Sequence, residues 1–337
     1  KLHILTDNRA KKRGILAEHG LSLFIEHENA NILFDTGQSD VYLRNAARMG
    51  VELDKTDCIV LSHGHYDHCG GLPCFPVSEQ FPKTYVHTAA FARRYALSPD
   101  GTTYRDIGIP WSCDEYENIK NALVFTAEYT QLAPGAHLLG EIPGTAEFED
   151  ISPGFYCGNE ADKAPDLMMD EQMLVCDAEK GLFVFLGCSH PGVVNCLNDV
   201  MKLFPDKKLH TLVAGMHLDH VSPPRLQMTI QHMIDLDIRR VIPLHCTGIF
   251  AICEMKRRLG TAALHYARGI PWSYRRRRFR SRLIPARNWF SERANSVFCE
   301  AFSDKVIEHF MCPRNNGSMP DADATGSCGD PACGDCL

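Results

Sequence analysis

The sequence predicts an α/β protein. Strand-like apolar runs alternate with helix-like segments, histidines follow several of the predicted strands, and 45% of the 337 residues are hydrophobic. A chain of this length and composition can bury a large core, as one big domain or two. We therefore expect a globular α/β fold with polar side chains gathered where its strands end.

The N-terminal segment predicts a sheet followed by a helix. The runs 2–7, 21–28 and 31–37 are rich in β-branched and aromatic residues, and "ENAN" supplies a turn between the last two. Residues 39–50 begin with Ser and Asp, carry apolar residues at helical spacing and end at a glycine, which predicts a helix. The run 57–63 returns to a strand.

Residues 95–165 interrupt this regularity. Proline, glycine and acidic residues separate short apolar pieces such as 122–129, so we interpret the region as an insertion or lid over a functional site. Regular patterns then return, with predicted strands at 181–190, 209–217 and 240–246 and a predicted helix at 224–238.

Charge and hydropathy exclude two classes of protein. A net charge of −7 does not favour nucleic-acid binding, which needs a basic surface, and the basic run 274–282 is more typical of a solvated linker. The apolar runs fall short of the roughly 20 residues that cross a bilayer, and the first residues lack the apolar core of a signal peptide. We expect a cytoplasmic protein without membrane association, whose 15 cysteines are mostly structural thiols.

The stretch "LSHGHYDHCGG", residues 61–71, predicts a metal site. It places His63, His65, Asp67 and His68 directly after a predicted strand. Imidazole and carboxylate ligands suit zinc, iron or manganese, and strand ends that meet at one sheet edge can add later histidines. A solvated histidine-rich loop is the alternative, although the glycines of this stretch also permit the tight backbone that a metal loop needs.

These residues resemble the metallo-β-lactamase-fold superfamily. "HGHYDH" matches its H-x-H-x-D-H signature, and "ILFDTG" is similar to its first motif, in which we expect Asp35 to support the histidine loop. Further segments resemble the branch of 7,8-dihydropterin-6-methyl-4-(β-D-ribofuranosyl)aminobenzene-5′-phosphate synthase-like metal-dependent hydrolases: "DNRA", "LAEHGLSLFIE", "GEIP", "DEQMLV", "GCSHPGVVN", "GMHL" and "PLHCTG". The resemblance covers 1–262 and implies an αβ/βα four-layer sandwich, with the insertion near 95–165 and a short C-terminal extension.

The resemblance also implies two divalent metal ions, zinc first, with iron or manganese as alternatives. Their implied ligands are His63, His65, Asp67, His68, His190 and His245. Where many members of the superfamily have a bridging aspartate, this chain has Cys188, which either bridges the metals or packs as a thiol and leaves the second metal weakly held.

Asp67 and His217 are the candidates for a catalytic role. His217 could be a ligand, a contact for substrate phosphate or a residue that orients a ligand, and His220 is expected at a helix start. The other histidines lack ligand spacing, so we expect surface or core roles for His19, His27, His87, His137, His210 and His232.

Three functions stay open at this point. Two adjacent metals favour hydrolysis, whereas the branch resemblance implies condensation of a dihydropterin diphosphate with an aminobenzene ribotide and release of pyrophosphate. Both reactions use a phosphate-bearing, pterin-type small molecule, for which Arg93, Arg94 and Arg105 are candidate contacts. The third is a non-catalytic metal-binding or redox-sensing protein linked to iron–sulfur cluster assembly.

The C-terminal residues resemble the start of a NifU/IscU-type iron–sulfur scaffold. "ACGD" is similar to its first cluster-ligand motif, with Cys333 as ligand and Asp335 as the neighbouring acid. The scaffold takes further cysteines from later segments, so we do not expect an intact cluster in this chain alone and infer an assembly partner or second chain. The expected domains are 1–262, a basic linker 263–301 and a truncated scaffold segment 302–337.

Overall fold

The computed structural model describes residues 1–76, 80–151, 154–159, 161–263, 329–330 and 335–336. The chain divides into two units, Lys1–Tyr274 and Arg275–Leu337. In the second unit, the described residues are two short antiparallel strands, β17 (Gly329–Asp330) and β18 (Asp335–Cys336). The basic run and Cys333 lie outside the described residues, and Asp335 is described only as strand backbone. The predicted domain boundaries therefore stay predictions.

Two mixed sheets of six strands form the centre of the first unit. The first has the order β1-β2-β3-β4-β5-β8, antiparallel from β1 to β3 and parallel from β3 to β8. Its strands are β1 (Leu2–Thr6), β2 (Ser22–Glu26), β3 (Asn31–Phe34), β4 (Cys58–Val60), β5 (Lys83–His87) and β8 (Leu123–Thr126).

The second sheet has the order β16-β15-β14-β13-β10-β9. Its strands β14, β15 and β16 are parallel neighbours, and β13, β10 and β9 continue the sheet in antiparallel pairs. Its strands are β9 (Tyr129–Ala133), β10 (Ala136–Leu139), β13 (Met173–Ala178), β14 (Gly181–Leu186), β15 (Leu209–Gly215) and β16 (Arg240–Leu244).

Helices cover the outer face of each sheet. They are α1 (Val41–Met49), α2 (Tyr66–Cys69), α3 (Glu117–Ala122), α4 (Val193–Leu203), α5 (Pro223–Asp235) and α6 (Ile249–Ala263), with 3-10 turns η1 (Leu53–Lys55), η2 (Leu72–Cys74), η3 (Thr88–Phe91) and η4 (His245–Thr247). Local signals set their ends. Gly50 ends α1 in a left-handed conformation, and the Ser222 side chain caps α5 before two prolines.

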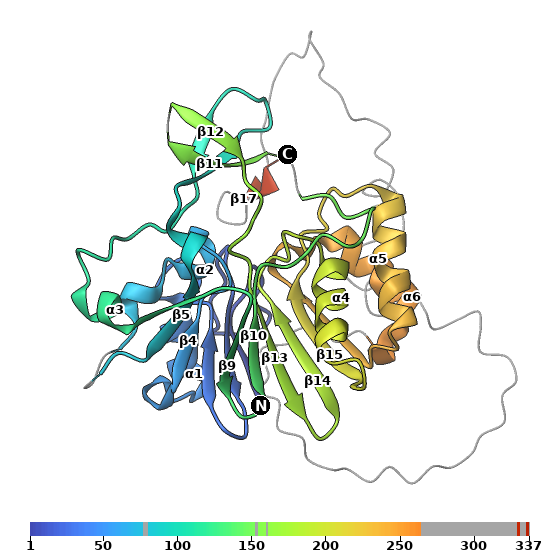
Figure 1. Cartoon of the computed structure of the whole chain (residues 1–337), viewed down its shortest axis with the longest axis horizontal. Coiled ribbons are helices and arrows are strands. Elements are labelled where there is room, and N and C mark those ends of the chain that lie inside the picture. Colours follow the sequence, from blue (N-terminus) through green and yellow to red (C-terminus); the bar gives the residue numbers. More distant parts are fainter. Residues whose placement is uncertain (77–79, 152–153, 160, 264–328, 331–334, 337) are drawn as a thin grey trace, which may run out of the picture. The chain divides into compact units, whose positions relative to one another are not determined.

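Three apolar clusters establish the four-layer order. Between the sheets, Leu23 and Val60 of the first pack with Leu174 and Val213 of the second. The two outer clusters join α1 to the first sheet and α4, α5 and α6 to the second, as Figure 1 shows for the second. This is the αβ/βα sandwich that the family resemblance implied.

The predicted insertion is two pieces rather than one. Residues 123–139 supply β8, β9 and β10 and so belong to the main sheets, which corrects the prediction of a single insertion over 95–165. The flanking pieces form a separate sheet of order β12-β11-β6-β7. Its strands are β6 (Arg94–Leu97), β7 (Tyr104–Asp106), β11 (Phe155–Asn159) and β12 (Asp162–Pro165). In Figure 1, β11 and β12 lie at the same end of the sandwich as α2.

The elements predicted by range are all present with shifted ends. Strand β4, for example, stops at Val60, which leaves His63 in the following loop. The loops after β4, β14, β15 and β16 leave the carboxyl ends of parallel strands, where sites of α/β folds usually lie. Within the described part of the chain, no helix is long and apolar enough to cross a membrane.

Candidate metal centre

The histidine loop follows β4 and is held by close backbone packing. His63 and His65 precede α2, while Asp67 and His68 lie within it. A Cβ atom on Gly64 would lie 2.0 Å from the Ala90 carbonyl oxygen, so the loop depends on glycine at this position. The sequence folds here as a tight turn that presents all four potential ligands from one short segment.

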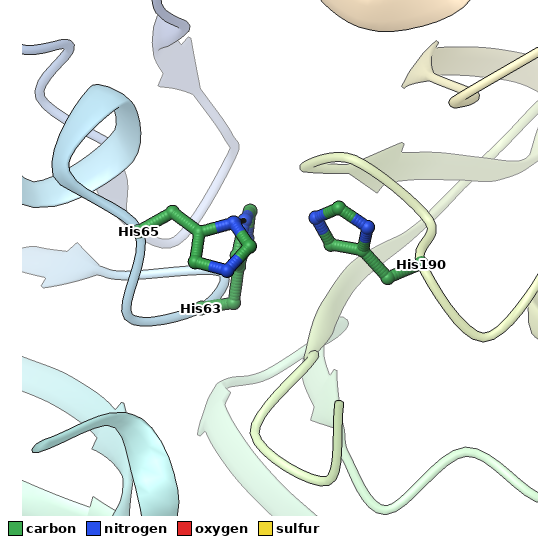
Figure 2. A group of neighbouring side chains, drawn as sticks. All are labelled: His63, His65 and His190. Carbon is green, nitrogen blue, oxygen red and sulfur yellow. Dashed lines mark hydrogen bonds between the residues drawn. The ribbon is translucent and has the colours of Figure 1, made fainter. Parts of the chain in front are cut away.

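The first ligand group consists of His63, His65 and His190. One nitrogen from each ring lies within 4.8 Å of the others, and His63 Nε2 is 3.0 Å from His65 Nδ1. Figure 2 shows the rings of His63 and His65, from the loop after β4, facing the ring of His190, which comes from the loop after β14. The geometry therefore joins histidines from the two sheets around one point.

The second group contains Asp67, His68 and His245. The distance from Asp67 Oδ2 to His245 Nε2 is 3.2 Å, and His68 Nε2 also lies 3.2 Å from His245 Nε2. Asp7 and Asn8 hold His245: the backbone N–H of His245 donates to Asp7 Oδ1, and its Nδ1 lies 2.7 Å from Asn8 Oδ1. These partners orient the imidazole so that Nε2 faces the other two residues.

Cys188 lies between the two groups. Its sulfur is 3.2 Å from His68 Nε2, and it forms candidate ligand groups with His63 and His68, with His190 and His217, and with His245 and Cys246. This placement agrees with a bridging role, which stays a prediction. Cys246 adds a second sulfur 3.3 Å from that of Cys188.

His217 lies beside the first group. Its ring centroid is 4.7 Å from that of His190 and 5.6 Å from that of Phe155 on β11. His217 Nδ1 is buried without a hydrogen-bond partner among the described residues. His217 therefore lies beside the ligand groups, within 4.8 Å of potential ligand atoms of Cys188 and His190, whereas the side chain of His220 is 89% exposed.

The buried histidines of the site fall into two kinds, those whose pKa is lowered and those whose pKa is raised. Burial, with the neighbouring histidines, lowers the pKa of His63 and His190, and burial lowers the pKa of His65 to about 3. Burial also lowers the pKa of His68, but Asp35 and Asp67 outweigh this effect and raise it to about 9. The first group is therefore neutral and ready to bind a cation.

The polar atoms of the site fit a bound metal. His65 Nε2 and both ring nitrogens of His190 are buried without a hydrogen-bond partner among the described residues, an arrangement that costs about 1–3 kcal/mol per group when nothing binds. Imidazole, carboxylate and cysteine sulfur are donors that divalent metal ions such as zinc bind. The residues present therefore fit bound metal ions.

Some residues of the centre were missed or placed elsewhere by sequence reasoning. His19 was expected to be structural, yet its Nε2 lies 3.2 Å from Asp67 Oδ2. Cys246 follows a predicted ligand, and Asp170 and Glu171 open the quoted segment "DEQMLV". The acidic pair directly before a strand was a signal that could have drawn attention to them.

The three arginines that were candidate phosphate contacts differ in exposure. Arg93 and Arg105 are exposed, but Arg94 is only 2% exposed and forms ion pairs with Asp166 and Asp170. The guanidinium of Arg94 is buried and already paired with two carboxylates, so Arg94 is not a substrate contact.

The sandwich and its histidine-lined edge define a class of metal-binding α/β proteins. A model of the metallo-beta-lactamase superfamily matches residues 16–146. Uncharacterized protein MJ0448 of Methanocaldococcus jannaschii is 33% identical over 257 residues, covering 76% of this chain and 94% of that relative. The chain belongs to the metallo-beta-lactamase superfamily.

Two further relatives cover most of the same region. The 7,8-dihydropterin-6-methyl-4-(beta-D-ribofuranosyl)-aminobenzene-5′-phosphate synthase of M. jannaschii is 30% identical, covering 70% of this chain and 83% of that protein. The crystal structure of Tm1679, a metal-dependent hydrolase of the beta-lactamase superfamily, aligns with a TM-score of 0.68 at 28% identity, over 80% of this chain and 96% of that chain.

The C-terminal resemblance is confirmed in sequence. A NifU-like N-terminal domain model matches residues 301–337. The iron-sulfur cluster assembly scaffold protein IscU of Aquifex aeolicus is 50% identical over 36 residues, 11% of this chain and 23% of that protein. The chain thus spans less than a quarter of the scaffold protein that it matches here.

Proposed function

We propose that this chain is a two-metal enzyme that acts on a phosphate-bearing small molecule of pterin type. The reaction is hydrolysis or a condensation that releases pyrophosphate. The observation that supports this most directly is the meeting of two ligand groups at one sheet edge, with Cys188 near members of both. When bound, two adjacent divalent ions activate water and polarise a phosphoryl oxygen.

Zinc is the proposed metal. His63, His65 and His190 would hold one ion, and Asp67, His68 and His245 the other. Cys188 would bridge them as a thiolate, a soft donor that zinc accepts more readily than manganese does.

The chain's own residues supply positioning and proton control. Before metal binds, burial raises the pKa of Asp67, but the charge of His68 and the hydrogen bonds from His19 and His245 outweigh this effect and hold that pKa well below its usual value. An ionised Asp67 can accept a hydrogen bond from an attacking water. We assign His217 the donation of a proton to the leaving oxygen, because its ring lies beside His190 and its Nδ1 is buried without a hydrogen-bond partner among the described residues.

The substrate class rests on the relatives and on one side chain. The synthase relative supports a pterin-type substrate, and the Tm1679 structure supports hydrolysis. Phe155 lies against His65, His190 and His217 and offers an aromatic face to a flat ring.

The test combines metal analysis with a substrate panel. Full-length protein is loaded with zinc, and release of phosphate or pyrophosphate is followed for phosphomonoesters, phosphodiesters and a dihydropterin diphosphate with an aminobenzene ribotide. We expect about two metals per chain, the number that a two-metal site requires, and metal-dependent turnover of at least one substrate. His65→Ala should lose metal and turnover together, while His217→Ala should lose turnover and keep metal.

Two results would contradict this proposal. Fully loaded protein that turns over no member of the panel would remove the substrate class, and His65→Ala with wild-type metal content would remove the ligand assignment. Cys188→Ser with both metals held at wild-type affinity would assign Cys188 to packing.

A second candidate function is favoured by the C-terminal match. We infer that residues 302–337 connect the chain to iron–sulfur assembly through a partner or second chain. Anaerobic purification of the full chain as a complex with its partner or second chain should yield iron and acid-labile sulfide that the same preparation of Cys333→Ala lacks. Equal iron and sulfide in both proteins would contradict the inference.

A further inference from the structure

The dipeptide Asp170-Glu171 contacts both ligand loops from a single buried position. It lies just before β13, and the two side chains are 0% and 2% exposed. Adjacent carboxylates are costly to bury unless each is hydrogen-bonded, so their partners matter. Those partners belong to two different loops.

Asp170 holds the histidine loop. Its Oδ2 accepts a hydrogen bond of 2.7 Å from the backbone N–H of Gly64, the residue between His63 and His65. On the other side, Asp170 Oδ1 lies 2.8 Å from Arg94 Nη2. The Arg94 ion pair fixes the carboxylate, and the carboxylate fixes the peptide that separates two ligands.

Glu171 holds the loop after β14. Its Oε1 accepts hydrogen bonds from the backbone N–H groups of Cys188, at 3.2 Å, and Ser189, at 3.0 Å. Its Oε2 accepts one from His190 at 3.4 Å and lies 3.8 Å from His63 Nδ1. This carboxylate therefore reaches three consecutive residues of one loop and one ring of the other.

The next residue strengthens the same connection. The backbone N–H of Gln172 donates to the Ser62 carbonyl oxygen, and its side chain donates to the Leu61 carbonyl oxygen, both at 2.8 Å. Both acceptors lie just before His63 in the chain. Residues 170–172 thus contact each of the two ligand loops through hydrogen bonds, and the loops belong to opposite sheets.

We propose that Asp170 and Glu171 are positioning residues that fix the separation of the two ligand loops. The inference rests on the metal site of the proposed function and names the two residues that set the geometry of that site. Metal ligands must be held within about 0.5 Å of their working positions, and loss of supporting hydrogen bonds typically costs about 10–100-fold in metal affinity. Asp170 binds the loop after β4 and Glu171 binds the loop after β14. Because the two residues are neighbours in the chain, the peptide bond that joins them limits the distance between the two loops.

The test uses cobalt(II) as the probe, because its visible absorption reports ligand geometry without any substrate. Full-length wild type, Asp170→Asn, Glu171→Gln and Glu171→Ala are titrated with cobalt in competition with a chelator, and circular dichroism checks the fold. We expect Glu171→Ala to lose about 10–100-fold in affinity with a changed spectrum. Glu171→Gln should lose less, because one amide oxygen can still accept the N–H groups of Cys188 and Ser189.

Glu149 provides the matched control. It is also a buried glutamate, and its Oε2 accepts the backbone N–H of Asn195 at 2.8 Å in α4. Glu149→Gln and Glu149→Ala should lower stability but leave cobalt affinity and the spectrum unchanged.

Wild-type affinity and spectrum in folded Glu171→Ala would overturn the inference, and so would an equal loss in Glu149→Ala. If Glu171→Ala does not fold, Glu171→Gln decides: an unchanged cobalt affinity and spectrum overturns the inference, and a weaker affinity with a changed spectrum supports it. Wild type that binds cobalt but turns over no phosphate substrate overturns only the proposed function. Wild type that binds no cobalt overturns both.

Discussion

Asp35 Oδ2 lies 2.7 Å from His68 Nδ1, and both side chains are fully buried. Asp35 also accepts hydrogen bonds from the backbone N–H and the hydroxyl of Ser62. One carboxylate therefore orients a ligand of the second group and fixes the start of the histidine loop, as the sequence predicted for this residue.

Asp35→Asn is expected to weaken binding of the second metal by about 10–100-fold, because the amide cannot restore the charge that faces His68. Metal per chain after dialysis against graded chelator measures the effect. Asp40→Asn is the control, since Asp40 pairs with Arg44 at the surface. Equal metal retention in wild type and Asp35→Asn would contradict the prediction.

Removal of metal should expose a pair of thiols to oxidation. The sulfurs of Cys188 and Cys246 are 3.3 Å apart, against about 2.05 Å in a disulfide. With hydrogen peroxide as oxidant, one thiol becomes a sulfenic acid and releases water, and the second thiol displaces another water to close the disulfide. Peptide mapping should find this link in chelated protein and not in zinc-loaded protein.

Cys246→Ser provides the control for that experiment, since it cannot form the link. A linked peptide in equal yield with and without zinc would show that metal does not protect the pair. Absence of the link in chelated protein would contradict the prediction that the metal-free pair oxidises to a disulfide.

Phe155→Ala is expected to raise KM more than it lowers kcat. The ring of Phe155 lies 5.2 Å from that of His190, and its loss removes an aromatic contact of about 0.5–1.5 kcal/mol beyond the area buried. Tyr156→Ala is the control, because the next side chain on a strand faces the other way and Tyr156 packs on Tyr104. Equal changes in both variants would contradict a specific role for Phe155.

The pH dependence of stability should include a contribution from Glu149. Burial raises its pKa above the usual 4.5, more than the backbone N–H groups of α4 lower it. The folded chain therefore holds this proton more tightly than the unfolded chain. The free energy of unfolding consequently falls as pH rises from 4.5 through the raised pKa.

Urea unfolding of zinc-saturated protein between about pH 5 and 8 measures this contribution. The side chain in Glu149→Gln cannot ionise. The free energy of unfolding of this variant should therefore fall less steeply with pH than that of wild type, by at most about 1.4 kcal/mol per pH unit. Glu28→Gln, at an exposed position, should follow wild type. Parallel curves for wild type and Glu149→Gln would contradict the prediction.

The parts of the site that could be predicted from sequence share a local signal. His63, His65, Asp67 and His68 form one compact motif, and His190 and His245 each follow an apolar strand. Alternation of strands and helices predicted the class of fold, and the resemblance supplied its four layers.

The residues that sequence reasoning missed depend on contacts between distant segments. Glu171 matters because its place just before β13 brings it to the loop after β14, and His19 because an irregular loop brings it to Asp67. The strands within 123–139 were assigned to an insertion, since their short apolar runs acquire partners only when the two sheets assemble. No local periodicity carries that information.

The two six-stranded sheets come from successive parts of the first unit: β1 to β5 and β8 form one, and β9, β10 and β13 to β16 form the other. The first part carries His63, His65, Asp67 and His68, while His190 and His245 come from the second. During synthesis, the early ligands therefore emerge from the ribosome long before the residues that complete their coordination. A site that uses ligands from both sheets can be completed only after the second sheet has been synthesised, so we expect metal binding by the full ligand set to follow the folding of both sheets.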